Sequence, residues 1–169
     1  MLRDLGSALA PDNAFAIIQG LETVALRMKQ HCENAEKVVN FLKKHKEVTK
    51  VIYSTEHEKK IADRAKQYLK GGNGPMVGIE LKGGIEAGKR FIESLKMFYH
   101  VANIGDARSL AIHPASTTHS QLNEKELAAS GVTQSYVRLC IGIEHIDDII
   151  DDLNQALNKS SKGSLKAVS

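Results

Sequence analysis

An apolar stripe at helical spacing runs through residues 11–45 and predicts one amphipathic helix from Pro11 to about His45. The stripe advances in steps of three and four through Ile17, Ile18, Leu21, Val24, Ala25, Met28, Cys32, Ala35, Val39 and Leu42. At a rise of 1.5 Å per residue, the helix would be roughly 50 Å long. A compact domain of 169 residues does not need such a helix. We therefore expect it to join two bodies or to pack on something outside the chain.

Beyond the long helix, short strands alternate with amphipathic helices. We expect strands at 48–54, 76–81, 99–103, 109–113 and 136–142, and helices at 58–69, 85–97, 123–129 and 146–157. The strands at 99–103 and 109–113 lie on either side of a turn at Gly105-Asp106. The alternation predicts an α/β (α+β) fold in which an open sheet carries helices on one face.

Charge and hydropathy exclude several classes of protein. The net charge is only +3, and no basic run is interleaved with aromatic residues, so we expect no nucleic-acid partner. No apolar stretch approaches the roughly 20 residues of a membrane span, and no signal peptide opens the chain, so we expect no membrane partner and a cytoplasmic location. The two cysteines, Cys32 and Cys140, lie in apolar patterns and are expected to be reduced core thiols.

Arg138 lies within the apolar run from Tyr136 to Ile143 that predicts a buried strand. A guanidinium does not deprotonate in proteins, and it does not lie in a core without an anionic partner. The partner is either an internal acid, with Glu144, Asp106 and Glu80 as candidates, or the carboxylate or phosphate of a ligand. The residues alone leave these two interpretations equally open.

Residues Gly83–Lys89 follow an expected strand and approach the spacing of a phosphate-binding loop. The next position should be Ser or Thr to hold Mg²⁺, but it is Arg90. The glycines also suit an ordinary strand-to-helix turn. Nucleotide binding at Gly83–Lys89 is therefore a remote alternative.

Three other polar positions could belong to a site. His113 and His119 could ligate a metal, but no third ligand accompanies them, so we expect loop histidines bonded to the backbone and no metal site. The hydroxyls of residues 116–118 lack an activating base. Asn103 ends an expected strand, where its amide could donate to a carboxylate or form a turn, and turn chemistry is the commoner use.

Taken together, several segments resemble the C-terminal part of the Cys/Met-metabolism pyridoxal-phosphate enzymes. They are the N-terminal runs at 2–6, 13–15, 19–23 and 26–28, Ala102–Leu110, His113–Ser120 with its His-Pro-Ala-Ser-x-Thr-His pattern, Val137–Leu139 and Gly142–Glu144. The resemblance covers about residues 1–157. The Ala-Asn-Ile-Gly-Asp-Ala run is most similar to the O-acetylhomoserine sulfhydrylase (O-acetylhomoserine aminocarboxypropyltransferase) branch.

The resemblance implies the fold of the fold type I pyridoxal-phosphate transferases. Residues 1–45 would be the end of a large domain plus a long interdomain helix. Residues 46–157 would form the small C-terminal domain with a mostly antiparallel sheet, and 158–169 a frayed tail. In that family an arginine in the matching strand binds the α-carboxylate of the amino-acid substrate. Arg138 matches this arginine, so the resemblance implies that Arg138 binds the substrate. Asn103 matches a position, commonly Ser in the lyases, that assists the same carboxylate.

One departure from the family concerns the cofactor. The Schiff-base lysine of the family lies in a Ser-x-Thr-Lys segment of the large domain, and this sequence has no such segment. We therefore expect no catalytic residue here, and pyridoxal phosphate is expected in the complete enzyme but not on this chain alone. The expected function is the substrate-binding portion of an O-acetylhomoserine sulfhydrylase-like enzyme of methionine synthesis by transsulfuration, inactive by itself. It would take an O-acetylhomoserine-type substrate when completed by a cofactor-binding half. A non-catalytic gene remnant or protein-interaction domain is the alternative, and self-association is expected in either case.

Overall fold

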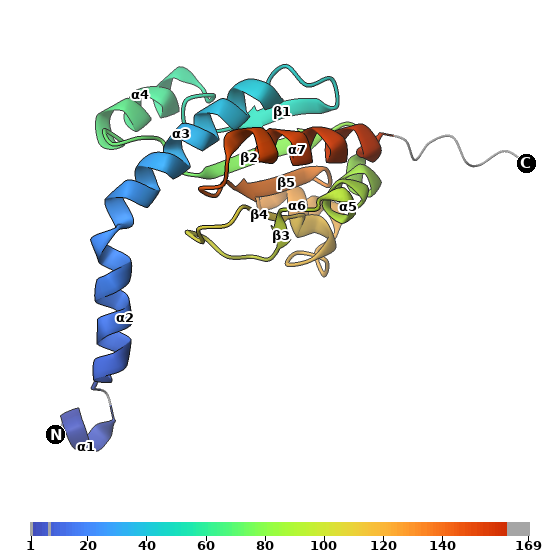
Figure 1. The fold of residues 1–169 in the computed structure, drawn as a ribbon. Helices are drawn as coiled ribbons and strands as arrows, with labels where there is room; N and C mark the ends of the chain where they lie inside the picture. The colour runs from blue at the N-terminus through green and yellow to red at the C-terminus, as the bar shows by residue number, and fades with distance from the viewer. Residues whose placement is uncertain (1, 7, 162–169) are drawn as a thin grey trace, which may run out of the picture.

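The computed structural model describes residues 2–6 and 8–161 as an α/β body with a helical arm (Figure 1). The elements in chain order are α1 (Leu2–Leu5), α2 (Pro11–Glu22), α3 (Val24–Leu42), β1 (Val48–Ile52), α4 (Lys59–Tyr68), β2 (Met76–Leu81), α5 (Gly84–Ser94), β3 (Tyr99–His100), β4 (Leu110–Ile112), the 3₁₀ turn η1 (Pro114–Ser116), α6 (Glu124–Ala129), β5 (Tyr136–Cys140) and α7 (Ile146–Ser160). The five strands form one sheet in the order β1-β2-β5-β4-β3.

The sheet is mostly antiparallel, as the resemblance implied. β2 pairs antiparallel with β1 and with β5, and β4 pairs antiparallel with β5. β3 is the exception because it runs parallel to β4, with Tyr99 opposite Leu110. The segment between β3 and β4 therefore does not form a hairpin. It contains Gly105-Asp106, but it carries the chain back so that β4 starts at the same end of the sheet as β3.

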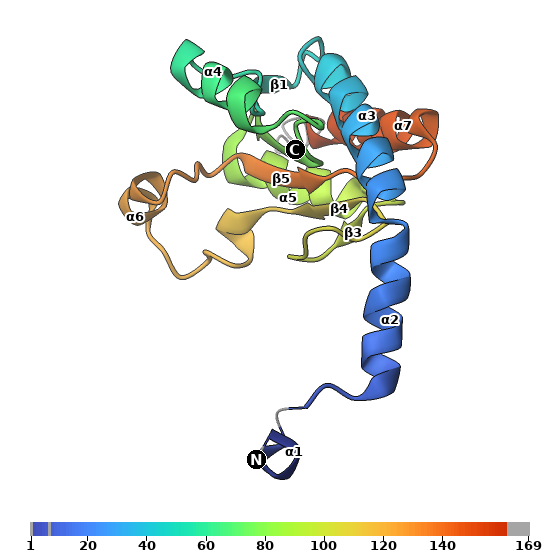
Figure 2. The ribbon, with the colours of Figure 1, turned by 90° about the vertical axis from the view of Figure 1, so that its left-hand side faces the viewer.

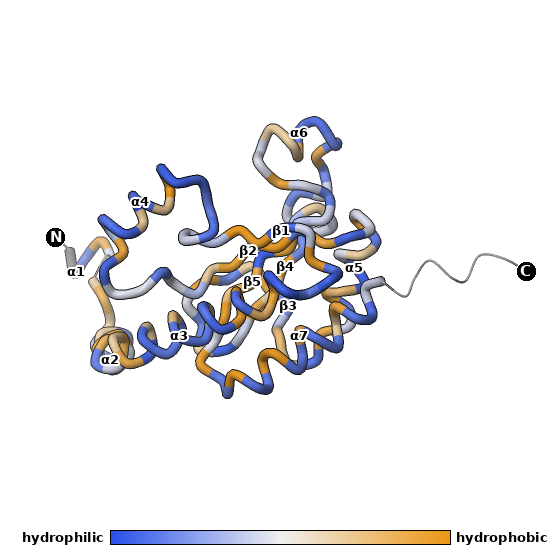
Figure 3. The backbone as a smooth tube through the Cα atoms, turned by 90° about the horizontal axis from the view of Figure 1, so that it is seen from above, coloured by the Kyte–Doolittle hydropathy of each residue, from blue (hydrophilic) through white to orange (hydrophobic). Residues whose placement is uncertain are grey.

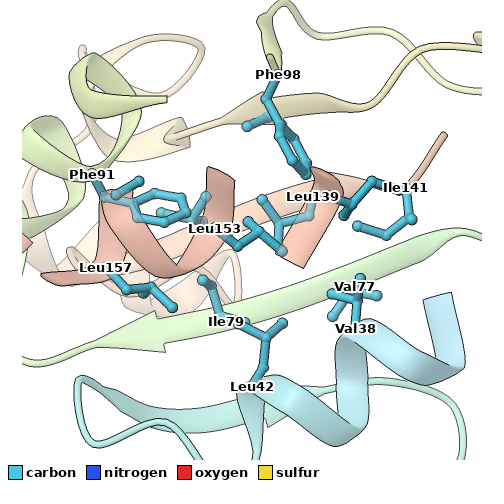
Figure 4. Close-up of a cluster of buried hydrophobic side chains, with 14 of the residues drawn as sticks. Val38, Leu42, Val77, Ile79, Phe91, Phe98, Leu139, Ile141, Leu153 and Leu157 are labelled. Carbon is cyan, nitrogen blue, oxygen red and sulfur yellow. The ribbon is translucent and has the colours of Figure 1, made fainter. Parts of the chain in front are cut away.

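Helices α3, α5 and α7 cover one face of the sheet, and the core lies between them and the strands (Figure 4). Alternate strand residues point into this layer because successive side chains of a strand face opposite sides. The fully buried strand residues on this face are Val77, Ile79, Val137 and Leu139. They meet Val38 and Leu42 of α3, Phe91 of α5 and Leu153 and Leu157 of α7. The predicted open sheet is confirmed, and its main helical layer lies on one face.

Two short helices lie on the other side of the sheet. Figures 2 and 3 show α4 and α6 away from the layer that α3 and α7 form. Each buries a single residue, Ala65 in α4 and Leu127 in α6. This second face of the sheet is consequently much more open than the first.

The predicted single helix over 11–45 is wrong in its continuity. The chain leaves helical geometry at Thr23, where φ is −109° and ψ is 6°, so α2 and α3 are separate helices that meet at a bend (Figure 1). The side chain of Arg27 donates to the carbonyl of Gly20 and to Thr23 Oγ1, so it satisfies acceptors that the interrupted helix leaves open. α2 points away from the sheet and buries no residue, whereas α3 buries seven, including Ala35, Val38 and Leu42.

The last helix, α7, runs to Ser160, three residues beyond its expected end at Leu157. Most of the expected tail, residues 162–169, lies outside the described residues. Among the helices described, none is both long enough and apolar enough to cross a membrane. Both cysteines are buried and unbonded, in agreement with the expected reduced thiols.

Candidate functional site

Arg138 lies in the middle of β5 on the open face of the sheet, between two fully buried neighbours that point the other way. Its partly buried guanidinium donates one hydrogen bond, from Nη2 to the main-chain carbonyl of Asn103, over 3.3 Å. A guanidinium carries five N–H donors, so a single neutral carbonyl at this distance leaves most of them unused.

The three internal acids that could have neutralised Arg138 are bound elsewhere. The Glu144 carboxylate accepts from the amide and the hydroxyl of Ser109, at 2.6 and 2.9 Å. Asp106 accepts from the main-chain amide of Arg108, and Glu80 lies 3.8 Å from Lys50. Within residues 2–6 and 8–161, no carboxylate forms an ion pair with Arg138. The internal-partner interpretation is therefore not supported, and the guanidinium can receive an anion from outside.

A hollow of about 270 Å³ adjoins Arg138 on the side of β1 and β2. Its lining comprises Ile52, Tyr53, Ser54, His57, Met76, Val77, Gly78, Tyr136 and Arg138. The ring of Tyr136 crosses over Gly78, where a Cβ would lie only 2.6 Å from Tyr136 Cε2. Burial raises the pKa of Tyr136, and the cationic Arg138 opposes that rise. The hollow is thus a partly apolar recess with one fixed cation and a neutral phenol on its wall.

Asn103 follows β3 and is exposed. Its side-chain Oδ1 accepts from the amide of Ile104 over 2.9 Å, which is the turn chemistry that its position favoured. Its main-chain carbonyl is the group that contacts Arg138. The fold therefore brings Asn103 and Arg138 together, although the contact runs through the backbone and not through the side-chain amide.

Residues Gly83–Lys89 do not form a phosphate-binding loop, so the structure does not support nucleotide binding there. Residues 84–94 are helical, so Lys89 lies inside α5 and pairs with Glu86 at 2.8 Å. Gly83 has a φ of +95°, which glycine adopts without strain. A Cβ on Gly88 would lie 2.4 Å from Nε2 of His113, so that glycine serves close packing. The glycine spacing comes from a turn and a packing contact.

His113 and His119 do not share a metal site. The buried His113 ring bonds to Ser116 Oγ and to the carbonyl of Gln134, both at 2.8 Å, and burial lowers its pKa. His119 bonds to the hydroxyl of Thr118. No cluster of three or more metal-ligating side chains occurs in the part of the chain that the structure describes. For His113 the expected backbone-bonded histidine is confirmed.

Tyr136 and Gly78 belong to the candidate site but were not singled out by the sequence. Period-two alternation along β5 places Tyr136 on the same face as Arg138, and that signal was available. Gly78 lies opposite Arg138 in the register of β2 and β5, and this pairing of distant segments cannot be predicted from local sequence patterns. The geometry therefore defines a recess on the open face of the sheet, with the Arg138 guanidinium on its wall and the central strand β5 as its support.

The chain belongs to the Cys/Met metabolism PLP-dependent enzyme family, whose match covers residues 1–158. It is 52% identical over 157 residues to the O-acetyl-L-homoserine sulfhydrylase of Leptospira meyeri, covering 92% of this chain and 36% of that protein. An L-methionine gamma-lyase from Fusobacterium nucleatum is 43% identical over 94% of this chain and 40% of its own length. The chain thus spans well under half the length of the curated relatives it matches.

A solved structure from Campylobacter jejuni shows the same fold. It is provisionally described as an O-acetylhomoserine (thiol)-lyase and contains a pyridoxyl-lysine monophosphate. The TM-score is 0.82 at 46% identity, over 93% of this chain and 37% of that one. The fold is therefore that of one part of a pyridoxal-phosphate-dependent enzyme.

Proposed function

We propose that the chain is the substrate-carboxylate-binding portion of an O-acetylhomoserine sulfhydrylase-like enzyme of homocysteine and methionine synthesis. One observation carries the proposal: Arg138 lies at the edge of a recess, and the described acids that could neutralise it are bound elsewhere. A guanidinium presents two parallel N–H donors to a carboxylate, which makes the pair strong and directional. Arg138 would hold the α-carboxylate, and Asn103 would fix the orientation of the guanidinium through its carbonyl.

We propose that the cofactor chemistry belongs to a part of the enzyme outside this chain. Pyridoxal phosphate supplies the electron sink for this family when it is attached to a lysine. The residues that line the recess beside Arg138 include no lysine. The donor set fits a carboxylate, and it does not include the amine that the cofactor needs. We therefore propose that the isolated chain binds no pyridoxal phosphate and is inactive, and that it works in the cytoplasm with a cofactor-binding half.

Complementation in two pieces tests this function. The chain would be mixed with the N-terminal remainder of the Leptospira meyeri relative, loaded with pyridoxal phosphate, and homocysteine formation from O-acetylhomoserine and sulfide would be measured. We expect activity from the mixture and none from either piece. Arg138→Leu should reduce kcat/KM by about 100-fold, since a charge-assisted hydrogen-bonded pair is worth up to about 3 kcal/mol. Arg64→Leu, on the exposed side of α4, is the matched control and should retain full activity.

Absence of activity in a mixture that contains both folded pieces would count against the enzymatic proposal and favour a second candidate, a non-catalytic interaction domain. One observation favours that candidate: α2 exposes Phe15 by 65%, Ile17 and Ile18 by 53% each and Leu21 by 61%. An apolar stripe of this kind indicates a surface that another chain covers. We propose self-association through α2 in the absence of the missing half. Sedimentation velocity should show that Ile18→Lys with Leu21→Lys shifts the chain toward monomer.

A further inference from the structure

The loop that carries Asn103 is anchored at one end by a partly buried carboxylate, that of Glu144. This loop, residues 101–109, is exposed over most of its length, but its last residue, Ser109, is fully buried. Glu144 accepts from the Ser109 amide at 2.6 Å and from its hydroxyl at 2.9 Å. Ser109 Oγ in turn accepts from the amide of Gly142 at 2.9 Å. We call Ser109, Gly142 and Glu144 the loop anchor.

The loop anchor depends on a glycine for its close approach. A Cβ on Gly142 would lie 2.1 Å from Glu144 Oε2, 2.5 Å from the Ser109 nitrogen and 2.6 Å from the Ala107 oxygen. The amide of Ile143 also donates to the Ala107 carbonyl at 2.9 Å. The end of the loop is therefore fixed against the segment that leaves β5, with no space for a side chain between them.

The same segment is held from the other side by α3. Asn34, which is fully buried, donates from Nδ2 to the carbonyls of Gly142 and Glu144, at 3.0 and 2.9 Å. The buried His31 donates from Nδ1 to the carbonyl of Ile141 at 2.6 Å. Residues 141–144 are thus held on one side by α3 and on the other by the loop anchor.

The loop anchor also affects the position of Arg138. The only hydrogen bond of its guanidinium within the described residues is to the Asn103 carbonyl, and Asn103 belongs to the loop that the anchor holds. Among the described residues, no hydrogen bond or ion pair joins Glu144 to Arg138, so Glu144 would act through the loop and not on the anion.

We propose that Glu144 is a positioning residue: its carboxylate, together with Ser109 and Gly142, holds the 101–109 loop so that the Asn103 carbonyl orients Arg138 for a substrate carboxylate. This inference rests on the proposed function of Arg138. It assigns Glu144, one of the acids that could have been the internal partner of Arg138, to the support of the site. It also makes the position of the loop depend on α3 through Asn34.

The test measures binding and loop order separately in the intact chain. The probe is O-acetyl-L-homoserine, followed by NMR at the Arg138 Nε–H signal, and hydrogen exchange reports on the Ser109 and Ile143 amides. Glu144→Ala should weaken the apparent Kd about tenfold, because the loop would no longer hold the Asn103 carbonyl in place to orient Arg138, and it should speed exchange at both amides. Glu144→Gln keeps an oxygen for the Ser109 amide and should restore most of the affinity. Ser109→Ala removes only the hydroxyl, and it is the variant to measure if Glu144→Ala does not fold.

A matched control separates positioning from plain stability. Asp152 is a buried carboxylate that, like Glu144, accepts from the backbone, here from the amides of Lys96, Met97 and Phe98, but it lies in the helical layer. Asp152→Asn should lower the melting temperature and leave the Kd of the folded protein unchanged. Unchanged probe affinity in folded Glu144→Ala, or an equal loss in Asp152→Asn, would overturn the inference. If the unmodified chain binds no probe, the proposed function fails, while unchanged amide exchange in Glu144→Ala would independently refute the anchor.

Discussion

The two faces of the sheet are made from the same strands, but one is packed against helices and the other is largely open. On β5, Val137 and Leu139 are fully buried against α3, α5 and α7, whereas Tyr136 and Arg138 face the opposite side and are only partly covered. The packed face stabilises the fold by removing apolar surface from water. The open face carries a cation without a described acidic partner and a recess. Neighbouring residues of one strand therefore separate stability from binding.

This difference shows why the α/β body can present a guanidinium without a described acidic partner and keep its fold. Successive side chains of a strand face opposite sides of the sheet, so the core depends on one alternate set of strand residues and the site on the other. Changes on the two faces should consequently have separable effects, and the separation can be tested by pairs of variants.

The largest effect is expected on the packed face. Leu139→Ala should lower the free energy of unfolding by about 2–5 kcal/mol, because it removes a fully buried side chain and leaves a cavity between β5 and the helices. Urea titration followed by circular dichroism measures the change. A loss below about 1 kcal/mol would mean that the helical layer collapses into the space, and that this face is less rigid than its packing indicates.

The next effect compares two glycines. Gly88→Ala forces a methyl to within 2.4 Å of His113, whose ring is fully buried and bonded at both nitrogens, so we expect a cost of about 1–3 kcal/mol. Gly78→Ala meets the Tyr136 ring at 2.6 Å on the open face, where the ring can swing outward. The Gly78 variant should therefore lose less stability and instead change the probe affinity at Arg138. Equal thermal shifts for the two variants, measured by calorimetry, would contradict the distinction between the faces.

Much of this architecture could be predicted from the residues, because strands and helices of the body follow local apolar periodicity. The bend at Thr23 could not be predicted, since the apolar stripe continues across it and threonine occurs in many helices. The parallel pairing of β3 with β4 was equally hidden, because strand pairing depends on how distant segments meet and not on the turn between them.

For the candidate site, the apolar run around Arg138 was sufficient to identify a cation that needs an anion. It could not determine which acids were available. Glu144 lies six residues from Arg138, but it binds Ser109 because the 101–109 loop packs against the end of β5. That choice is made by tertiary packing, and only the structure shows it.

A smaller effect on stability is expected at the site itself. Arg138→Leu should change the free energy of unfolding by no more than about 1 kcal/mol, because the side chain has one weak neutral partner and no ion pair to lose. Probe binding should be abolished in the same variant. Chemical denaturation and an NMR titration on one sample measure both properties. A loss of stability as large as that of Leu139→Ala would show that Arg138 is part of the folding core.

The smallest effect concerns the acid side of the stability profile. Burial lowers the pKa of His113 from its ordinary value of 6.5, so the folded state favours the neutral ring. The stabilisation is therefore complete above pH 6.5 and is lost as the pH falls below that value toward the lowered pKa. His113→Gln should be less stable at neutral pH but should lose less on acidification, and the exposed His57→Gln should keep the slope of the unmodified chain. Parallel slopes for the unmodified chain and His113→Gln between pH 7 and pH 5, in repeated urea titrations, would show that the ring takes up a proton as readily in the folded state as in the unfolded state. The bonds of His113 to Ser116 and Gln134 would then have to be reassigned.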